Sequence, residues 1–306
     1  MRHHQRLLLF ILSVMTQPSF AQGIVSARTN WAGNSFPGSG DIVVPSEGAR
    51  ITVAPTGEVL TNCYWDETHN NASVWRNGKF LARAPFMVDS GYLGGDGVTS
   101  SQFLLLISQN FRGGEGSNKP PVGMGVSFRT MDLKPMQIPG GKGGGEQRVQ
   151  NQSYLPVVPQ EHGFNDMEIL PIAASRTGEK FILLICDRIG NQIQRFMVDV
   201  VVNNNVQVSS IQPIDSIAVQ KPMSIAVDRD RNLWFGKNET PPQIRVFDRE
   251  GKQLDKRIEL DAPATDLAIR NDELWVVPTK VFRFPFTTSK GISRDQADTS
   301  VNRSVT

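Results

Sequence analysis

The stretch that decides the fold is FILLICDRIGNQIQRFMVD, residues 181–199. It holds a continuous apolar run, residues 181–186, and a second run, residues 192–196, in which polar and apolar residues alternate. The polar segment Asp187-Arg188-Ile189-Gly190-Asn191 separates the two runs. Two such runs on either side of a turn that contains Gly and Asn are typical of a β-hairpin. The sequence therefore predicts a hairpin here.

The same pattern returns twice towards the C-terminus, as LWFGKNETPPQIRVFD (residues 233–248) and LWVVPTKVFRFP (residues 274–285). The strand anchors Ile182, Leu233 and Leu274 are 51 and 41 residues apart (233 − 182 and 274 − 233). Repeats of roughly 40–50 residues with several short strands each are typical of β-propeller blades. The sequence predicts an all-β protein and a β-propeller.

Two further units lie closer to the N-terminus. Residues 49–81 contain four short apolar runs separated by turn residues, which is the content of one blade. A looser unit begins near residue 94 and resumes at residues 123–128. Five units are thus legible, and a mature chain of about 285 residues divided by a blade of about 47 residues gives six. We therefore expect a six-bladed propeller whose sixth blade is built from the two ends of the chain.

The segments around the repeats are assigned by composition. Residues 1–21 have a basic start, a short apolar core and a small-residue cleavage signal at Ser19-Phe20-Ala21, which predicts a secretory signal peptide cut after Ala21. Residues 22–44 form an irregular lead-in with one short strand at residues 41–44. The propeller spans residues 45–290, with a Gly-rich insertion near residues 112–159, and residues 291–306 form a polar tail. We expect a secreted or periplasmic protein.

Charge and histidine content exclude several functions. Cleavage removes Arg2 and Arg6, so Lys+Arg falls from 32 to 30 against 30 Asp+Glu and the formal charge falls from +2 to 0. A neutral chain gives no electrostatic reason to expect nucleic-acid binding. The mature chain keeps two histidines, His69 and His162, which excludes a three-histidine zinc site. The apolar run of the signal is too short to span a membrane, and no later run is long enough.

Cys63 and Cys186 are the two cysteines of the chain. Export to an oxidising compartment would permit a disulfide between them. Each, however, lies beside the polar turn of a different repeat unit, so we expect two buried thiols.

Two polar clusters are candidate sites. The first is Trp65-Asp66-Glu67-Thr68-His69-Asn70, where carboxylates, an imidazole and an aromatic ring could make an acid/base pair or a ligand site. Its catalytic candidates are Asp66, Glu67 and His69, and its ligand-binding candidates are Trp65, Asp66 and His69. The alternative is an exposed turn capped by Asp66, as Asp187 caps the turn of the later unit.

The second cluster is Glu161-His162-Gly163-Phe164-Asn165-Asp166, which precedes an apolar run. His162 and Asp166 are its ligand-binding candidates, because their side chains could face the centre of a propeller. The alternative is a solvated connecting loop.

Three segments resemble a known family: CDRIGNQIQRF, SIAVDRDRNLWFG with QIRVFDREGKQL, and, more faintly, DLAIRNDELWVV. They resemble NHL repeats, and the broader layout of residues 45–290 resembles the six-bladed propellers of the SMP-30/gluconolactonase/luciferin-regenerating-enzyme group. That resemblance implies a divalent metal such as Ca²⁺, held by Glu, Asn and Asp side chains, which would polarise a lactone carbonyl and activate water.

The metal ligands that the resemblance implies are incompletely matched. Glu47 and Asn165 stand nearest to the family's Glu and Asn ligands, so they are the candidate metal ligands. Met223 stands where the family has its Asp, and a thioether does not replace a carboxylate at a hard cation.

We therefore expect an exported, monomeric and non-catalytic binding module that takes a protein or carbohydrate partner and has no established cofactor. The alternative function is a Ca²⁺-dependent lactone or ester hydrolase that uses Glu47, Asn165 and the region of Asp66 and Glu67. The two functions differ in whether carboxylates from several blades converge at one mouth of the propeller.

Overall fold

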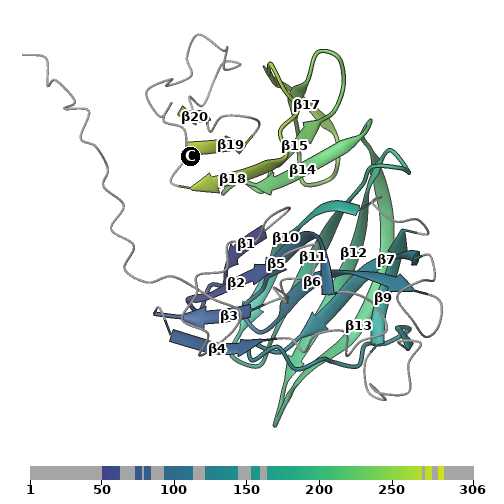
Figure 1. Ribbon diagram of the computed structural model, residues 1–306, viewed down its shortest axis with the longest axis vertical. Coiled ribbons are helices and arrows are strands. Elements are labelled where there is room, and N and C mark those ends of the chain that lie inside the picture. Colours follow the sequence, from purple (N-terminus) through teal and green to yellow (C-terminus); the bar gives the residue numbers. More distant parts are fainter. Residues whose placement is uncertain are drawn as a thin grey trace, which may run out of the picture. The chain divides into compact units, whose positions relative to one another are not determined.

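The chain folds as a series of antiparallel sheets (Figure 1), seen in a computed structural model that describes residues 50–62, 73–77, 79–83, 93–112, 121–143, 153–158, 164–270, 273–277 and 282–285. All of these residues belong to one unit, residues 31–306. None of them is helical, so the prediction of an all-β protein is confirmed for the described ranges. The same ranges contain no helix that is long and apolar enough to cross a membrane.

The first sheet matches the unit that the sequence predicted for residues 49–81. Its strands pair in chain order and are β1 (Arg50–Val53), β2 (Glu58–Asn62), β3 (Ser73–Arg76) and β4 (Lys79–Arg83). Two later sheets repeat this order. One holds β10 (Phe164–Ser175), β11 (Gly178–Asp187), β12 (Gln192–Val202) and β13 (Val206–Ala218), and the other holds β14 (Pro222–Val227), β15 (Leu233–Lys237), β16 (Gln243–Phe247) and β17 (Gln253–Glu259).

Two sheets depart from this four-stranded order. One has the order β5-β6-β7-β9-β8 and comprises β5 (Leu93–Ser100), β6 (Leu105–Arg112), β7 (Pro121–Arg129), β8 (Lys142–Gly143) and β9 (Ser153–Val158). The range 112–159, expected as a Gly-rich insertion, thus supplies β7, β8 and β9. The last sheet has three strands in the described residues, β18 (Asp266–Arg270), β19 (Glu273–Val277) and β20 (Phe282–Pro285).

The predicted hairpin of residues 181–199 is confirmed as β11 and β12, which pair from Asp187 opposite Gln192 along the whole length of β11. The Asp187 carboxylate closes the turn. It accepts the Gly190 N–H at 2.7 Å and the side-chain N–H groups of Gln192 at 3.1 Å and Gln194 at 2.9 Å. Asn191 takes the left-handed conformation that such a turn needs, with φ of 52°.

The apolar run of β11 is continuous because both of its faces are buried. Leu183 and Ile185 pack in a core with Leu106 and Phe128 of the preceding sheet. The alternate residues, among them Leu184, pack in a second core with the following sheet. A strand covered on both sides has no polar face, which explains why this stretch does not alternate. Cys186 lies in the second core as a thiol, whereas Cys63 lies outside the described residues.

Successive sheets are joined through their first strands. β1 contacts β5, β5 contacts β10, β10 contacts β14, and β14 contacts β18. A separate apolar core fills each of the four interfaces between successive sheets. Four-stranded meanders that follow one another through their first strands are consecutive blades of a β-propeller. Five sheets are present in the described residues, three of them four-stranded, and the predicted sixth blade is not among them.

Two tight turns of the fourth sheet offer a test of local conformation. Residues 228–232 and 248–252 form equivalent five-residue turns, each closed by two backbone hydrogen bonds, and their fourth positions are Arg231 at φ of 65° and Gly251 at φ of 93°. The left-handed conformation is unfavourable for an L-residue by roughly 1–2 kcal/mol. Arg231 is exposed, so its side chain adds little packing.

Arg231→Gly is therefore expected to raise the free energy of unfolding by about 0.5 kcal/mol, because relief of the turn exceeds the entropy that glycine adds to the unfolded chain. Urea denaturation followed by tryptophan fluorescence measures the change. A loss of stability would show that the Arg231 side chain contributes more than its backbone conformation costs.

Candidate functional site

Polar side chains recur on the first strands of four successive sheets. Thr99 lies on β5, Asp166 and Glu168 on β10, Ser224 on β14 and Asp266 on β18. We call these five residues the first-strand cluster; the strands that carry them are labelled in Figure 1. They are the polar groups from which a site at the centre of the sheets could be built.

Asp166 is a buried carboxylate that links two sheets by hydrogen bonds. Its Oδ1 accepts the N–H of Met167 at 2.9 Å, and its Oδ2 accepts the N–H of Ile225, on β14, at 3.0 Å. The residue is 6% exposed. Both oxygens of this carboxylate are therefore engaged by backbone donors, one of them from the neighbouring sheet.

Glu168 lies two residues further along β10 and is partly buried. Its Oε1 accepts the N–H of Ile169 at 2.7 Å and the hydroxyl of Thr99 at 2.9 Å, so it links β10 to β5. Burial raises the pKa of the Glu168 carboxyl, and the negative charge of Asp266 raises it further, whereas the two hydrogen bonds act in the opposite direction.

The cluster continues onto the last two sheets. Oδ1 of Asp266 accepts the N–H of Leu267 at 2.9 Å, the same local bond that Asp166 makes with Met167. The Ser224 hydroxyl donates to the carbonyl of Ala264 at 2.8 Å and so ties β14 to the segment that leads into β18. The cluster thus connects four successive sheets by hydrogen bonds from or to side chains.

Burial, and to a smaller extent the charge of Asp266, raise the pKa of Glu168 and so favour its protonated form. A carboxyl with a raised pKa beside a second carboxylate is the arrangement of many acid/base pairs. A metal site needs more. Among the described residues there is no group of three or more His, Cys, Asp or Glu side chains placed to hold an ion. Glu47 and the Asn165 side chain, which stand at two of the ligand positions implied by the family resemblance, lie outside the described part of the chain, and the third position is Met223.

Because the pKa of Glu168 is raised, we expect the stability difference between wild type and Glu168→Gln to depend on pH. The folded state binds the Glu168 proton more tightly than the unfolded state does. The contribution of Glu168 to the free energy of unfolding therefore falls as the pH rises from the ordinary carboxyl pKa of 4.5 through the higher pKa of the folded state. Glu168→Gln removes this ionisation and keeps an acceptor oxygen for Thr99. It is expected to be more stable than wild type at pH 7 by about 1 kcal/mol. At pH 4 the two proteins should be equally stable.

Thermal denaturation of both proteins at pH 4 and pH 7 measures this difference. If Glu168→Gln were less stable than wild type at pH 7 but not at pH 4, the fold would have to stabilise the charged form of Glu168. If the difference did not depend on pH, folding would not shift the pKa of Glu168.

Of the site residues proposed from the sequence, Asp166 lies in the described part of the chain, in β10, where it links two sheets by the hydrogen bonds given above. Asn165 lies in β10, but its side chain is outside the described part of the chain. Met223 lies in β14 and is partly buried. The remaining candidates, Glu47, Trp65, Asp66, Glu67, His69 and His162, lie outside the described residues.

Sequence reasoning missed Thr99, Glu168, Ser224 and Asp266. Glu168, Ser224 and Asp266 stand among apolar residues in the segments MEIL, MSIAV and DLAI, near the start of consecutive units. A polar residue that recurs at the opening of each unit was the available signal.

Other buried charges also hold backbone segments together. Arg195, 5% exposed, pairs with Asp215 and donates to the Asp215 carbonyl at 2.7 Å. It also donates to the carbonyls of Arg249 and Glu250 at 3.4 Å, in the turn of the next sheet. Glu179 accepts the N–H groups of Gln102 at 3.0 Å and Phe103 at 3.3 Å in the preceding sheet.

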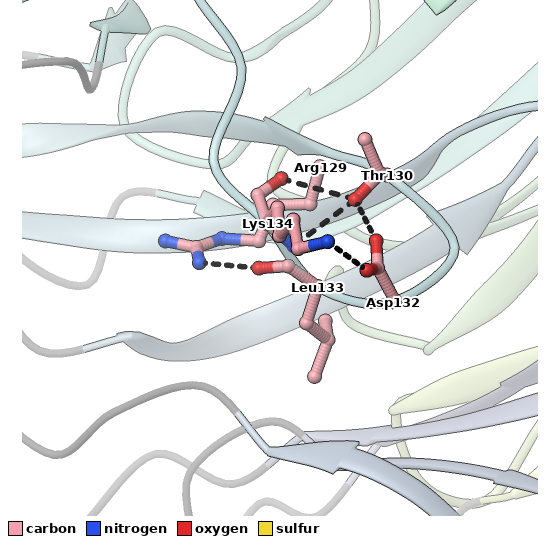
Figure 2. A network of polar contacts seen from close by, with 5 residues as sticks. All are labelled: Arg129, Thr130, Asp132, Leu133 and Lys134. Carbon is pink, nitrogen blue, oxygen red and sulfur yellow. Dashed lines mark hydrogen bonds and ion pairs between the residues drawn. The ribbon is translucent and has the colours of Figure 1, made fainter.

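A fully buried arginine ends β7 (Figure 2). Figure 2 shows the bond that Arg129 Nη1 donates to the Leu133 carbonyl at 2.9 Å. Its Nε donates to the Ser127 hydroxyl at 3.1 Å. The turn it supports is closed on its exposed side by the ion pair between Lys134 Nζ and Asp132 Oδ2 at 2.7 Å. Lys134 and Thr130, which bond to the Asp132 carboxylate, hold its pKa below the ordinary value. Arg129 is thus part of the architecture of the second sheet.

Comparison with known proteins gives no family. No protein-family model and no curated protein match this sequence. Several solved structures are similar in outline. BBS1N, in complex with ARL6DN, has a TM-score of 0.46 at 12% identity over 79% of this chain, which spans 64% of the length of that chain.

Two bacterial structures are similar at the same level. Aldose sugar dehydrogenase from Streptomyces coelicolor, in its PQQ-bound form, has a TM-score of 0.42 at 13% identity over 84% of this chain and 87% of that chain. Apo AztD from Citrobacter koseri has a TM-score of 0.36 at 11% identity over 81% and 73%. These two neighbours are β-propeller proteins. Similarity at this level assigns no activity, so the function is argued from the residues.

Proposed function

We propose that this chain is an exported β-propeller that acts as a binding module for a protein or carbohydrate partner. One observation carries the proposal. The carboxylates of the first-strand cluster accept backbone N–H groups of Met167, Ile225, Ile169 and Leu267. Acids that are bound in this way connect backbone segments of the scaffold, and a general acid or base has to be able to reach a substrate.

The sheet topology supports one edge as the binding surface. Each four-stranded sheet is antiparallel, so its second and fourth strands end at the edge where its first strand begins. The connection between the second and third strands and the connection to the next sheet therefore both start at that edge. Residues 63–72 connect β2 to β3, and residues 159–163 connect β9 to β10. Both candidate clusters of the sequence, around Asp66 and His162, therefore belong to connections at this edge. Connections on a rigid scaffold are where binding residues concentrate.

Export is part of the proposal and follows from the predicted signal peptide. The mature protein would begin at Gln22 and carry no formal net charge. N-terminal sequencing of the protein from the exported fraction tests this. A protein that keeps Met1 and stays with the cytoplasmic fraction would contradict export and, with it, the class of partner.

The binding function is tested with the mature protein on an array of glycans and of exported proteins from the host. The double variant Asp66→Ala/His69→Ala is expected to lose at least about tenfold in affinity for the bound partner, since it removes two polar groups from the proposed edge. Asp230→Ala is the matched control, because the turn between β14 and β15 lies at the opposite edge of its sheet and Asp230 is exposed. Equal binding by wild type and the double variant would contradict the proposed edge.

A second function is favoured by one feature, the Glu168 carboxyl, whose pKa is raised by burial and further by the charge of Asp266 on β18. This second function is the lactone or ester hydrolase. Glu168 and Asp266 would take the role of the family's Asp, whose position in this chain is occupied by Met223. A panel of lactones and aryl esters tests it. Hydrolysis by wild type that is lost in both Glu168→Gln and Asp266→Asn would favour the hydrolase over the binding module.

A further inference from the structure

The third strand of the fourth sheet carries a cation with an unused hydrogen-bond donor. Arg245 lies on β16, and its Nε is the one buried side-chain nitrogen or oxygen in the described part of the chain that has no hydrogen-bond partner. The residue as a whole is partly exposed. A buried donor on a charged group lowers stability when it has no acceptor, and such a donor in a native protein indicates an ion or a water. Arg245 is therefore a candidate ligand-binding residue.

Two more cations share the face of the sheet on which Arg245 lies. Arg245 is in register with Phe235 on β15 and with Arg257 on β17, so the three side chains form one row across the strands. Lys237 stands two residues after Phe235 on β15 and belongs to the same face. Phe235 packs in the core towards the third sheet. The cations extend this face beyond the core, towards the outer strands.

The nearby acid Glu239 is engaged by residues other than Arg245. Its Oε1 pairs with Lys237 Nζ at 2.5 Å, and its Oε2 accepts the side-chain N–H of Gln243 at 2.8 Å. Burial raises the pKa of Glu239, but the bonds from Lys237 and Gln243 and the charges of Lys237 and Arg245 outweigh it, so the pKa lies below the ordinary value of 4.5. Glu239 is thus an ionised partner of Lys237, and Arg245 acts on it through its charge.

The charge balance around Arg245 favours an anion with a single charge. Lys237 and Glu259 belong to the row next to that of Arg245. The ion pair between Arg257 and Glu259 is 3.9 Å long, and these side chains are 61% and 62% exposed, so the pair is weak. The two rows with Glu239 hold three cations and two carboxylates, which leaves one positive charge (3 − 2). A carboxylate neutralises that charge, whereas the dianion sulfate would leave one negative charge.

We propose that Arg245 and Arg257, on the outer strands of the fourth sheet, form a binding site for a carboxylate group. The planar guanidinium of Arg245 donates to both carboxylate oxygens, a geometry that fits this anion. Arg257 supplies a second cation, and its long, exposed side chain can move to admit the ligand. Lys237 neutralises Glu239, so that this acid does not repel the bound group.

Acetate titration of the intact mature protein at pH 7, followed by proton–nitrogen NMR, tests the site. The Nε–H signal of Arg245, assigned by its loss in Arg245→Lys, is expected to shift and to saturate as acetate is added. Arg245→Lys keeps the charge and loses the planar fork of donors. Its affinity for acetate, read from the backbone amide signals of β16, is expected to fall at least about tenfold.

Arg231→Lys is the matched control. Arg231 is an exposed arginine in a turn at the opposite edge of the same sheet, so this variant should bind acetate as wild type does. Glucuronate and N-acetylaspartate amide are further probes, and tighter binding of one of them than of acetate identifies an acidic sugar or an acidic side chain as the source of the carboxylate.

Three outcomes would overturn the proposal. The Arg245 signal could stay in place at every acetate concentration, which would leave water as the acceptor of Nε. Sulfate or phosphate at equal ionic strength could shift the signal more than acetate does, which would exclude a carboxylate as the preferred ligand. Arg245→Lys could bind acetate as tightly as wild type, which would place acetate elsewhere. Because acetate is the probe, this result is separate from the search for a partner on the array.

Discussion

Asp166→Ala is expected to lower the free energy of unfolding by about 3 kcal/mol, because it leaves two buried N–H groups without their acceptor. These donors, on Met167 and Ile225, lie 2.9 Å and 3.0 Å from the two carboxylate oxygens. The second of them belongs to β14, so the substitution also removes a bond between two sheets. Urea denaturation monitored by tryptophan fluorescence gives the midpoint and slope from which the change is calculated.

Asp166→Asn is the informative control. Its amide keeps one acceptor oxygen and the size of the side chain, so it is expected to lose about half as much stability as Asp166→Ala. If the free energy of unfolding changed by less than about 0.5 kcal/mol in both variants, as at ordinary surface positions, Asp166 would not stabilise the contact between the two sheets.

Arg129→Ala is expected to lower the free energy of unfolding by about 4 kcal/mol, since it empties a buried volume and removes two hydrogen bonds. Arg129 is fully buried at the end of β7. Its guanidinium donates to the Leu133 carbonyl (Figure 2) and to the Ser127 hydroxyl. Leu133 packs in the core between the first and second sheets. The loss should therefore loosen that interface as well as the turn.

Calorimetric melting of Arg129→Ala and of Arg257→Ala measures the contrast. Arg257 is an exposed arginine whose ion pair with Glu259 is 3.9 Å long, and such surface pairs contribute about 0–1 kcal/mol. If the two variants lost similar amounts of stability, the buried hydrogen bonds of Arg129 would not be what holds the turn of residues 130–134 in place.

Much of the fold could be predicted from local patterns in the sequence. The hairpin of β11 and β12 was visible because its turn contains Gly and Asn and its apolar runs stand on both sides. The continuous run FILLIC fits a strand between two sheets, and the structure assigns its alternate residues to two different cores. Local turn chemistry and burial on both faces are properties of neighbouring residues, which is why these features can be seen without coordinates.

The second sheet and the first-strand cluster depend on contacts between residues far apart in the chain. β8 is two residues long, Lys142–Gly143, in a Gly-rich segment, and it exists because β9 pairs with it. Thr99 meets Glu168 across 69 positions and Asp166 meets Ile225 across 59. No local pattern encodes such a pairing. Asp166 was selected from the sequence as a ligand-binding candidate, and its observed role is to hold two sheets together.

The account's central claim is that the side chains of the first-strand cluster connect backbone segments by hydrogen bonds and do not hold a metal. A thermal melt of the mature protein in EDTA, and then with Ca²⁺, Mg²⁺, Mn²⁺ or Zn²⁺, tests this most directly. An ion that binds the folded state would add about 2.7 kcal/mol at a hundredfold excess over its dissociation constant. The account predicts the same midpoint in every solution. A rise with one ion that is lost in Glu168→Gln or Asp266→Asn would contradict it.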